Sequence, residues 1–326
     1  MRFLLRRLAE AAALFWVVLT LTYFLLRAAP GDPEALLVDP SASQADIAAA
    51  RERLGLDAPV LVQYARWTGG VLKADLGESF THQRAVSAVL SDALPFSIGL
   101  GLASLVLTFA IGVTIGAVQA ARRGDRMDVA LTIMTTAAYA APAYWLALAL
   151  IAVFTYGAST WGLPPALRLP AFGVRDPAGE ATGMAAAADV ARHALLPTIT
   201  LTAIGAAGIA RYARTIIADL LALPFVRTAR AKGVAPHVIH ARHVVANARA
   251  PLVVLFALAL PGVLAGSVFV ETVFSWPGMG RLMVTAIVAR DYPLVMGATL
   301  LFAGVVILSN LAADLILPLL DPRRRE

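Results

Sequence analysis

The residues most suggestive of chemistry are three histidines that recur at every third position of one basic segment: His237, His240 and His243. On a helix they form a drifting stripe, and imidazole nitrogens are common zinc ligands. A metal site usually also needs neighbouring carboxylates or fixed supporting hydrogen bonds, and the only acid between residues 218 and 250 is Asp219. Solvated or interface histidines explain the stripe more simply, so we predict no metal site.

Motifs for catalysis are missing from the sequence. It has no Gly-x-x-x-x-Gly-Lys-Ser/Thr phosphate loop, no Gly-x-Ser-x-Gly elbow and no His-Glu-x-x-His pair. With no cysteine, thiolate metal sites and cysteine nucleophiles are excluded as well. We therefore assign no catalytic residue and expect no cofactor in this chain.

The composition predicts a membrane protein of the all-α class. Of the 326 residues, 59% are hydrophobic and 15% are charged, whereas a soluble domain has about 45–50% and about 25%. A bilayer crossing takes roughly 20 apolar residues. Arg27 and a Pro-Gly-Asp-Pro sequence follow the first apolar run, which favours an anchor over the alternative of a cleaved signal peptide. Six runs can cross: Leu8–Leu26, Phe96–Ala121, Val129–Phe154, Leu195–Ala210, Pro251–Val270 and Pro293–Leu317.

Charge placement predicts the orientation of these spans. Sixteen of the 27 Lys and Arg residues fall on the side that holds the two termini and two loops, and 14 of the 21 acids fall on the other side. Because cytoplasmic loops are enriched in Lys and Arg, both termini should be cytosolic. The net charge of +6 then follows from orientation, and the basic residues lack the interleaved aromatics of a nucleic-acid surface.

The chain divides by sequence into residues 1–28 (tail and first span), 29–94 (an external loop subdomain) and 95–326 (a five-helix core). Within the external part, Ser43 and Asp46 resemble a capping box that opens a short helix ending before Gly55. Val60, Tyr64 and Trp67 form a second apolar stripe. This stripe fits either a cap on the membrane surface or a docking surface for an external partner.

The cytosolic loop at residues 218–250 is too long for a simple connection. Pro224 can open a short helix, Gly233 can end it in the left-handed conformation, and Pro236 can open a second helix that reaches about Arg249. An apolar face lies beside basic residues on the first helix, which suits insertion into a groove of a soluble partner. Adsorption to anionic lipid is the alternative.

Inside the predicted spans, ionisable residues near the midplane are almost absent, so an ion-coupled transporter is disfavoured. Gly112 with Gly116, and Gly262 with Gly266, are spaced for close helix contact, either within the chain or against a second membrane subunit. Aromatic side chains near Pro142 could line a substrate pathway, although packing is the commoner role of such residues: Tyr139, Tyr144 and Trp145.

Nearly the whole chain resembles the B-type membrane permease subunits of binding-protein-dependent ABC importers for dipeptides, oligopeptides and nickel. The match includes Ala29-Pro30-Gly31-Asp32-Pro33, Asp75-Leu76-Gly77 with Ser79-Phe80, Phe274-Ser275-Trp276-Pro277-Gly278 and Arg290-Asp291-Tyr292-Pro293. The most specific segment resembles the peptide-branch coupling motif and comprises Phe225, Val226, Arg227, Thr228, Ala229, Arg230, Ala231, Lys232 and Gly233. The wider superfamily begins this motif with Glu-Ala-Ala, which is missing here.

The resemblance implies a six-span type I importer permease in a bacterial cytoplasmic (inner) membrane, carrying short peptides or a related small solute. It also implies four kinds of partner: a second homologous permease, two ATPase subunits or domains that bind ATP and Mg, an external solute-binding protein, and the lipid bilayer. The coupling helix would sit in a cleft of the ATPase. A stand-alone secondary transporter and a non-transporting scaffold are the rival functions.

Overall fold

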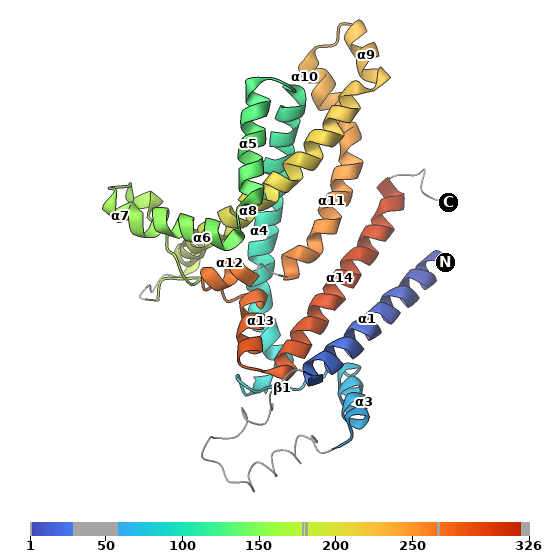
Figure 1. The fold of residues 1–326 in the computed structure, drawn as a ribbon, viewed down its shortest axis with the longest axis vertical. Helices are drawn as coiled ribbons and strands as arrows, with labels where there is room; N and C mark the ends of the chain where they lie inside the picture. The colour runs from blue at the N-terminus through green and yellow to red at the C-terminus, as the bar shows by residue number, and fades with distance from the viewer. Residues whose placement is uncertain (1, 29–57, 178, 180–181, 266–267, 321–326) are drawn as a thin grey trace. The chain divides into compact units, whose positions relative to one another are not determined.

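The computed structural model describes residues 2–28, 58–177, 179, 182–265 and 268–320, which are helical almost throughout (Figure 1). Six helical segments among them are long and apolar enough to cross a membrane, as predicted. They are Leu5–Ala28, Val86–Ala121, Ala143–Thr160, Gly183–Ala222, Arg242–Leu260 and Tyr292–Ala312. The helix expected near Ser43 and the motif at Ala29–Pro33 lie outside the described residues.

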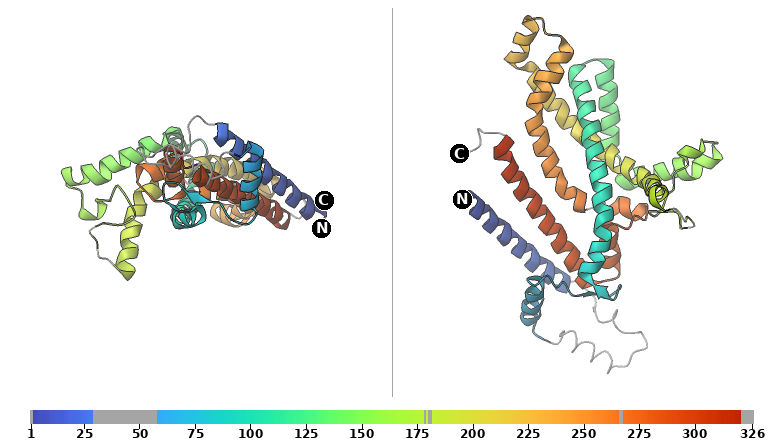
Figure 2. Two further views of the ribbon diagram at one scale, coloured as in Figure 1. Left: turned by 90° about the horizontal axis from the view of Figure 1, so that it is seen from below. Right: turned by 180° about the vertical axis from the view of Figure 1, so that it is seen from behind.

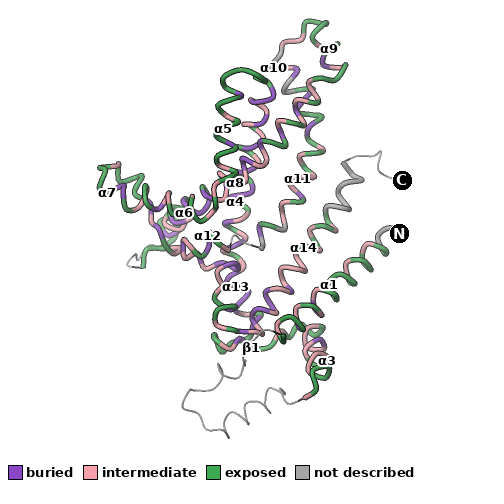
Figure 3. Tube along the Cα trace, in the orientation of Figure 1, coloured by how far each residue is buried: buried purple, intermediate pink, exposed green. Residues whose placement is uncertain are grey.

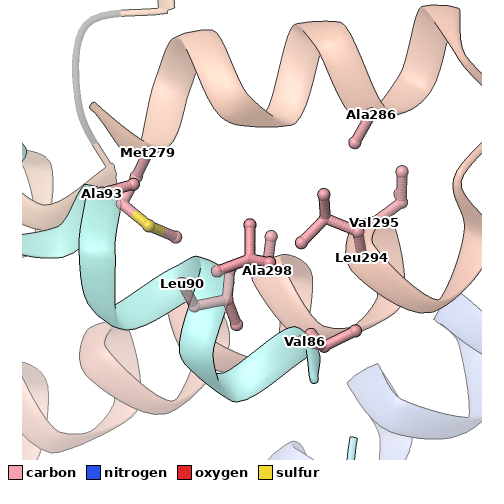
Figure 4. Packing of buried hydrophobic residues seen from close by; sticks show 9 residues of the cluster. Val86, Leu90, Ala93, Met279, Ala286, Leu294, Val295 and Ala298 are labelled. Carbon is pink, nitrogen blue, oxygen red and sulfur yellow. The ribbon is translucent and has the colours of Figure 1, made fainter. Parts of the chain in front are cut away.

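The described helices fall into two compact units. The first is drawn from Met1–Ser97 and Pro277–Leu311. Its elements are α1 (Arg2–Ala28), α3 (Val60–Val71), the paired strands β1 (Glu78–Ser79) and β2 (Arg84–Ala85), the start of α4 (Val86–Ala121), α13 (Met279–Val288) and most of α14 (Tyr292–Leu320). Its core packs the start of α4 against α13 and α14 around Val86, Leu90, Met279 and Leu294 (Figure 4).

Helix α1 lies beside α14 and is largely exposed on its other sides (Figures 2 and 3). A Cβ atom built on Gly304 of α14 would lie 3.9 Å from Phe15 of α1. Exposed apolar side chains such as Leu21 and Leu25 are suited to lipid contact in a helix of this length.

The aromatic stripe on α3 packs against α1. The rings of Tyr64 and Trp67 lie 5.3 Å from that of Tyr23, and Tyr64 stacks on Phe24 at 5.5 Å. Because Thr20 donates its hydroxyl hydrogen to Trp16 O, Tyr64 Oη donates to Thr20 Oγ1 at 2.7 Å. The stripe's contacts therefore fit the cap that the sequence allowed better than they fit an open docking surface.

Asp291 joins the turn after β1 to the beginning of α14. Its Oδ2 accepts hydrogen bonds from Ser79 Oγ (2.6 Å), Thr81 Oγ1 (2.7 Å) and Thr81 N (3.0 Å), while Oδ1 accepts from Leu294 N (3.2 Å) and caps α14. Burial raises the pKa of this carboxyl, but the hydrogen bonds from Ser79, Thr81 and the backbone of Phe80 outweigh it and hold the pKa below its ordinary value.

The second unit is drawn from Ile98–Trp276 and Ala312–Glu326. It contains the rest of α4, α5 (Arg126–Ala140), α6 (Ala143–Ile151), the π-helical η2 (Ala152–Gly157), α7 (Ala158–Thr160), the 3-10 turn η3 (Pro165–Leu167), α8 (Gly183–Ala222), α9 (Pro224–Ala231), α10 (Pro236–Val238), the π-helical η4 (Ile239–Val244), α11 (Val245–Ala265) and α12 (Val268–Val273).

The prediction of one continuous span over Val129–Phe154 is wrong, because the helix breaks at Ala141 and Pro142. Both residues are extended, with ψ of 128° and 135°. The proline ring disfavours the helical conformation of the residue before it, so α5 ends and α6 starts in a new direction. By contrast, α8 extends the short fourth run in both directions and includes Arg211 and Arg214.

Glycines allow α4 and α8 to touch along their backbones. A Cβ atom on Gly112 would lie 2.8 Å from Ala206 O, and one on Gly116 would lie 2.5 Å from Ala210 O. Residue numbers rise together along this contact, so the two helices run parallel and an odd number of membrane crossings separates them. The close contact predicted for Gly112 and Gly116 is thus confirmed as packing within the chain.

Replacing Gly116 by Ala should lower the thermal stability of the purified chain in detergent, because the added methyl group overpacks the contact at a cost of about 1–3 kcal/mol. Gly262→Ala in α11 is the matched control, since a Cβ there meets no described atom within 4 Å and alanine favours the helix. Equal unfolding temperatures for the two variants would contradict the packing.

Asp291→Asn should destabilise the chain by about 1–3 kcal/mol at pH 7, because the buried hydroxyl and amide donors lose a charged acceptor. Since the folded pKa is depressed, the stabilisation is full above the unfolded pKa of about 3.9 and is lost as the pH falls below it. Thermal unfolding at pH 7 and pH 3 should show a larger acid-induced loss in the unaltered chain than in the variant.

Asp92→Asn is the control for Asp291→Asn. Asp92 forms an exposed ion pair with Arg84 at 2.9 Å, and exposed pairs contribute about 0–1 kcal/mol. If Asp291→Asn matched this control at both pH values, the capping role of Asp291 would be disproved.

Candidate functional site

The short basic helix α9 begins and ends at the residues that its sequence predicts. Leu223 is extended with ψ of 151°, and Pro224 occupies the first helical turn. At the other end Gly233 has φ of +76°. Gly233 N donates to Arg230 O (2.9 Å) and Val234 N to Ala229 O (3.1 Å), the two bonds of a Schellman motif. The predicted helix and its left-handed glycine are confirmed.

The apolar face of α9 packs onto the chain itself. Val226 is 0% exposed and lies in a cluster with Ile217 of α8 and with Ile239 and Val244 of η4. Phe225 and Ala229 cover the edge of the same cluster. Val226 is therefore already packed against α8 and η4, whereas Phe225 and Ala229 are half-buried. Insertion of α9 into a partner's groove stays a prediction.

The outward face of α9 is polar and basic. Arg227, Thr228, Arg230 and Lys232 are exposed, together with Ala231 and Gly233. Thr228 Oγ1 bonds to Pro224 O at 3.1 Å, one turn back within the helix. The face offers three cations to another molecule.

The helix after α9 starts at Pro236, as predicted, but it passes through η4 and continues beyond Arg249 to Ala265 as α11 (Figure 1). The wide π-helical turn at Ile239–Val244 has no simple sequence signal. His237 is exposed and His243 is half-buried, while the side chain of His240 is outside those described. Among the described residues, no three His, Asp or Glu side chains are grouped to hold a metal ion.

The three aromatic residues suggested for a pathway occupy two helices. Tyr139 is near the end of α5, where the Arg211 guanidinium of α8 lies 5.1 Å from its ring centre, a cation–π contact. Tyr144 and Trp145 lie at the start of α6, and all three side chains are more than half exposed. The structure thus separates them at the break before Pro142, and their role in a pathway stays a prediction.

Known proteins match nearly the whole length of the chain. The family model described as "Binding-protein-dependent transport system inner membrane component" matches residues 112–326, and the corresponding N-terminal model matches residues 1–101. The oligopeptide transport system permease protein AppB of Bacillus subtilis is 33% identical over 98% of both chains. The di/tripeptide transport system permease protein DppB of Pseudomonas aeruginosa is 35% identical over 99% of this chain and 98% of its own.

A solved structure shares the fold. A chain of the MetNI methionine ABC transporter in an inward-facing conformation aligns with a TM-score of 0.50 and 18% identity, over 72% of this chain and 97% of that chain. At this identity the likeness describes the fold alone, which is that of a type I importer permease.

Gly233→Val should loosen the turn between α9 and α10, because a β-branched residue at φ of +76° costs roughly 1–2 kcal/mol. We expect trypsin to cleave after Arg230 or Lys232 several-fold faster in the variant, as local opening becomes more populated. Ala231→Val, on an exposed helical residue of the same segment, is the control. Equal cleavage rates would show that the turn tolerates a side chain.

Proposed function

Because the chain belongs to the family of binding-protein-dependent transport system inner membrane components, we propose that it forms half of the translocation pathway of an ATP-driven peptide importer. It is a multi-pass protein of a bacterial inner membrane and a permease subunit of an ABC importer. Short peptides are the proposed cargo, since the relatives are named for oligopeptide and di/tripeptide transport.

The proposed partners supply what this chain lacks. The sequence has no phosphate loop, so ATP and Mg would be bound by two ATPase subunits or domains. A second homologous permease would complete the pathway, and an external solute-binding protein would deliver the peptide. Both termini and α9 would face the cytosol, on the side rich in Arg.

The observation that carries the coupling role is the orientation of α9. A helix that adsorbs to a bilayer buries an apolar face in the lipid. In α9 that face, around Val226, is buried in the chain, and the exposed face carries Arg227, Arg230 and Lys232. This arrangement favours a protein partner with an acidic or polar cleft over lipid. We name α9 the coupling helix.

Coupling through such a helix is mechanical. Pro224 follows α8 after a single extended residue, and the helix containing η4 and α11 starts soon after Gly233. Movement of an ATPase subunit against the coupling helix would thus be transmitted to α8 and α11, which flank it in the chain. Type I importers of this kind alternate access by rocking helices against one another.

The test is reconstitution. We expect the tagged chain to purify in mild detergent with a second permease and ATP-hydrolysing subunits. In proteoliposomes with the binding protein, di- and oligopeptides should stimulate ATP hydrolysis and enter the vesicles only when ATP is present. Uptake driven by an ion gradient without ATP would support the secondary transporter, and stimulation by a non-peptide solute alone would refute the peptide cargo.

Arg230→Glu combined with Lys232→Glu should weaken ATPase association about tenfold or more at low salt. The introduced carboxylates would repel an acidic cleft, and such like-charge repulsion costs at least the roughly 1.4 kcal/mol that corresponds to a tenfold change in affinity. Arg123→Glu with Arg126→Glu is the control, because it makes an equal charge change at exposed residues of the α4–α5 turn and the start of α5. Co-purification at low and high salt measures the effect. Unchanged association of the Arg230 and Lys232 variant at both salt concentrations would contradict docking by this face.

A further inference from the structure

An ion pair between the buried Asp128 and the half-exposed Arg214 joins α5 to α8 next to the coupling helix. Arg214 of α8 donates from Nε to Asp128 Oδ1 at 3.0 Å and from Nη2 to Asp128 Oδ2 at 2.8 Å. This two-point geometry fixes the orientation of both groups, unlike a single contact. Asp128 is 4% exposed, so its carboxylate is almost fully enclosed.

The α4–α5 turn is built around the same carboxylate. Gly124 N donates to Asp128 Oδ2 at 3.0 Å. Asp125 caps α5, accepting from Met127 N at 2.9 Å and Asp128 N at 3.0 Å. The turn is therefore held by its own hydrogen bonds, and Arg214 binds it to α8.

The pair lies beside the buried residues that pack against the coupling helix. Ala213, next to Arg214, and Ile217, about one turn further along α8, belong to the buried cluster that holds Val226. Ala120 of α4, just before the turn, belongs to that cluster too. One turn earlier, Gly116 brings the backbones of α4 and α8 together.

We propose that Asp128 and Arg214 are positioning residues for coupling, which hold the inner end of α8 on the α4–α5 turn so that α4, α5 and α8 move together when the coupling helix moves. The proposal rests on the proposed function of the coupling helix. Without the pair, α8 could shift against the turn, and part of the movement delivered at Val226 would be lost before it reached the pathway.

Variants that remove one charge of the pair test this proposal. The measured quantity is the ratio of ATP molecules hydrolysed to peptides imported. In the complete complex, Asp128→Asn and Arg214→Gln should raise that ratio about fivefold, within the range of roughly 2- to 30-fold expected for changes along a coupling network. Arg214→Lys keeps the charge but loses the two-point contact, so its ratio should be intermediate. Asp92→Asn, which breaks an exposed pair in the other unit, is the control and should leave the ratio unchanged.

A cross-link gives a second test that does not depend on how well the charge variants fold. The chain contains no cysteine, so Asp128→Cys with Arg214→Cys introduces the only two thiols when the partner subunits are cysteine-free. Before cross-linking, the double variant should be uncoupled. A short bifunctional methanethiosulfonate that joins the two thiols should bring the ratio back toward that of the unaltered complex.

The results separate the two proposals. If the cross-link stops transport, or leaves the ratio as it was before cross-linking, α8 and the turn do not act as one body and the positioning role is refuted. A normal ratio in Asp128→Asn and Arg214→Gln refutes it as well. If the unaltered complex shows no ATP-dependent peptide uptake, the proposed function itself fails.

Discussion

The burial of Val226 is the interaction on which the functional site depends. A helix of eight residues is too short to be stable alone, so α9 exists because its apolar face is buried against α8 and η4. The same burial decides which face is left for a partner, namely the one with Arg227, Arg230 and Lys232. It also packs the coupling helix against α8 and against η4, the segment that leads into α11.

Close contact between α4 and α8 extends this connection into the membrane. Gly112 and Gly116 bring the two backbones together, and just beyond this contact the pair Asp128–Arg214 joins α8 to α5. Because helices gain little from hydrophobic association in lipid, such packing and hydrogen bonding are what hold them together. The same unit thus contains the helix that would receive a force and the helices that would deliver it.

Local rules made part of this structure predictable from sequence. Pro224 and Gly233 define α9 because each has one strong backbone preference, and the Gly112–Gly116 spacing predicted a close contact. Proline disfavours the helical conformation of the residue before it, so Pro142 indicated a helix end at Ala141. The prediction missed this end because the apolar run continues through both residues. The bonds of Asp128 to Arg214 and of Asp291 to Ser79 join residues 86 and 212 positions apart, so no local pattern reveals them. The burial of Val226 in α9 likewise depends on the position of η4, which no local pattern predicts.

The most direct test of the coupling account is to find out what touches the outward face of α9 in the membrane. A photo-activated cross-linking side chain at the exposed position 228, with position 123 as the comparison, can be activated in the intact complex with and without ATP. The account predicts that position 228 cross-links to an ATP-hydrolysing subunit with a yield that changes on ATP binding. Cross-links from position 228 to lipid alone would contradict it.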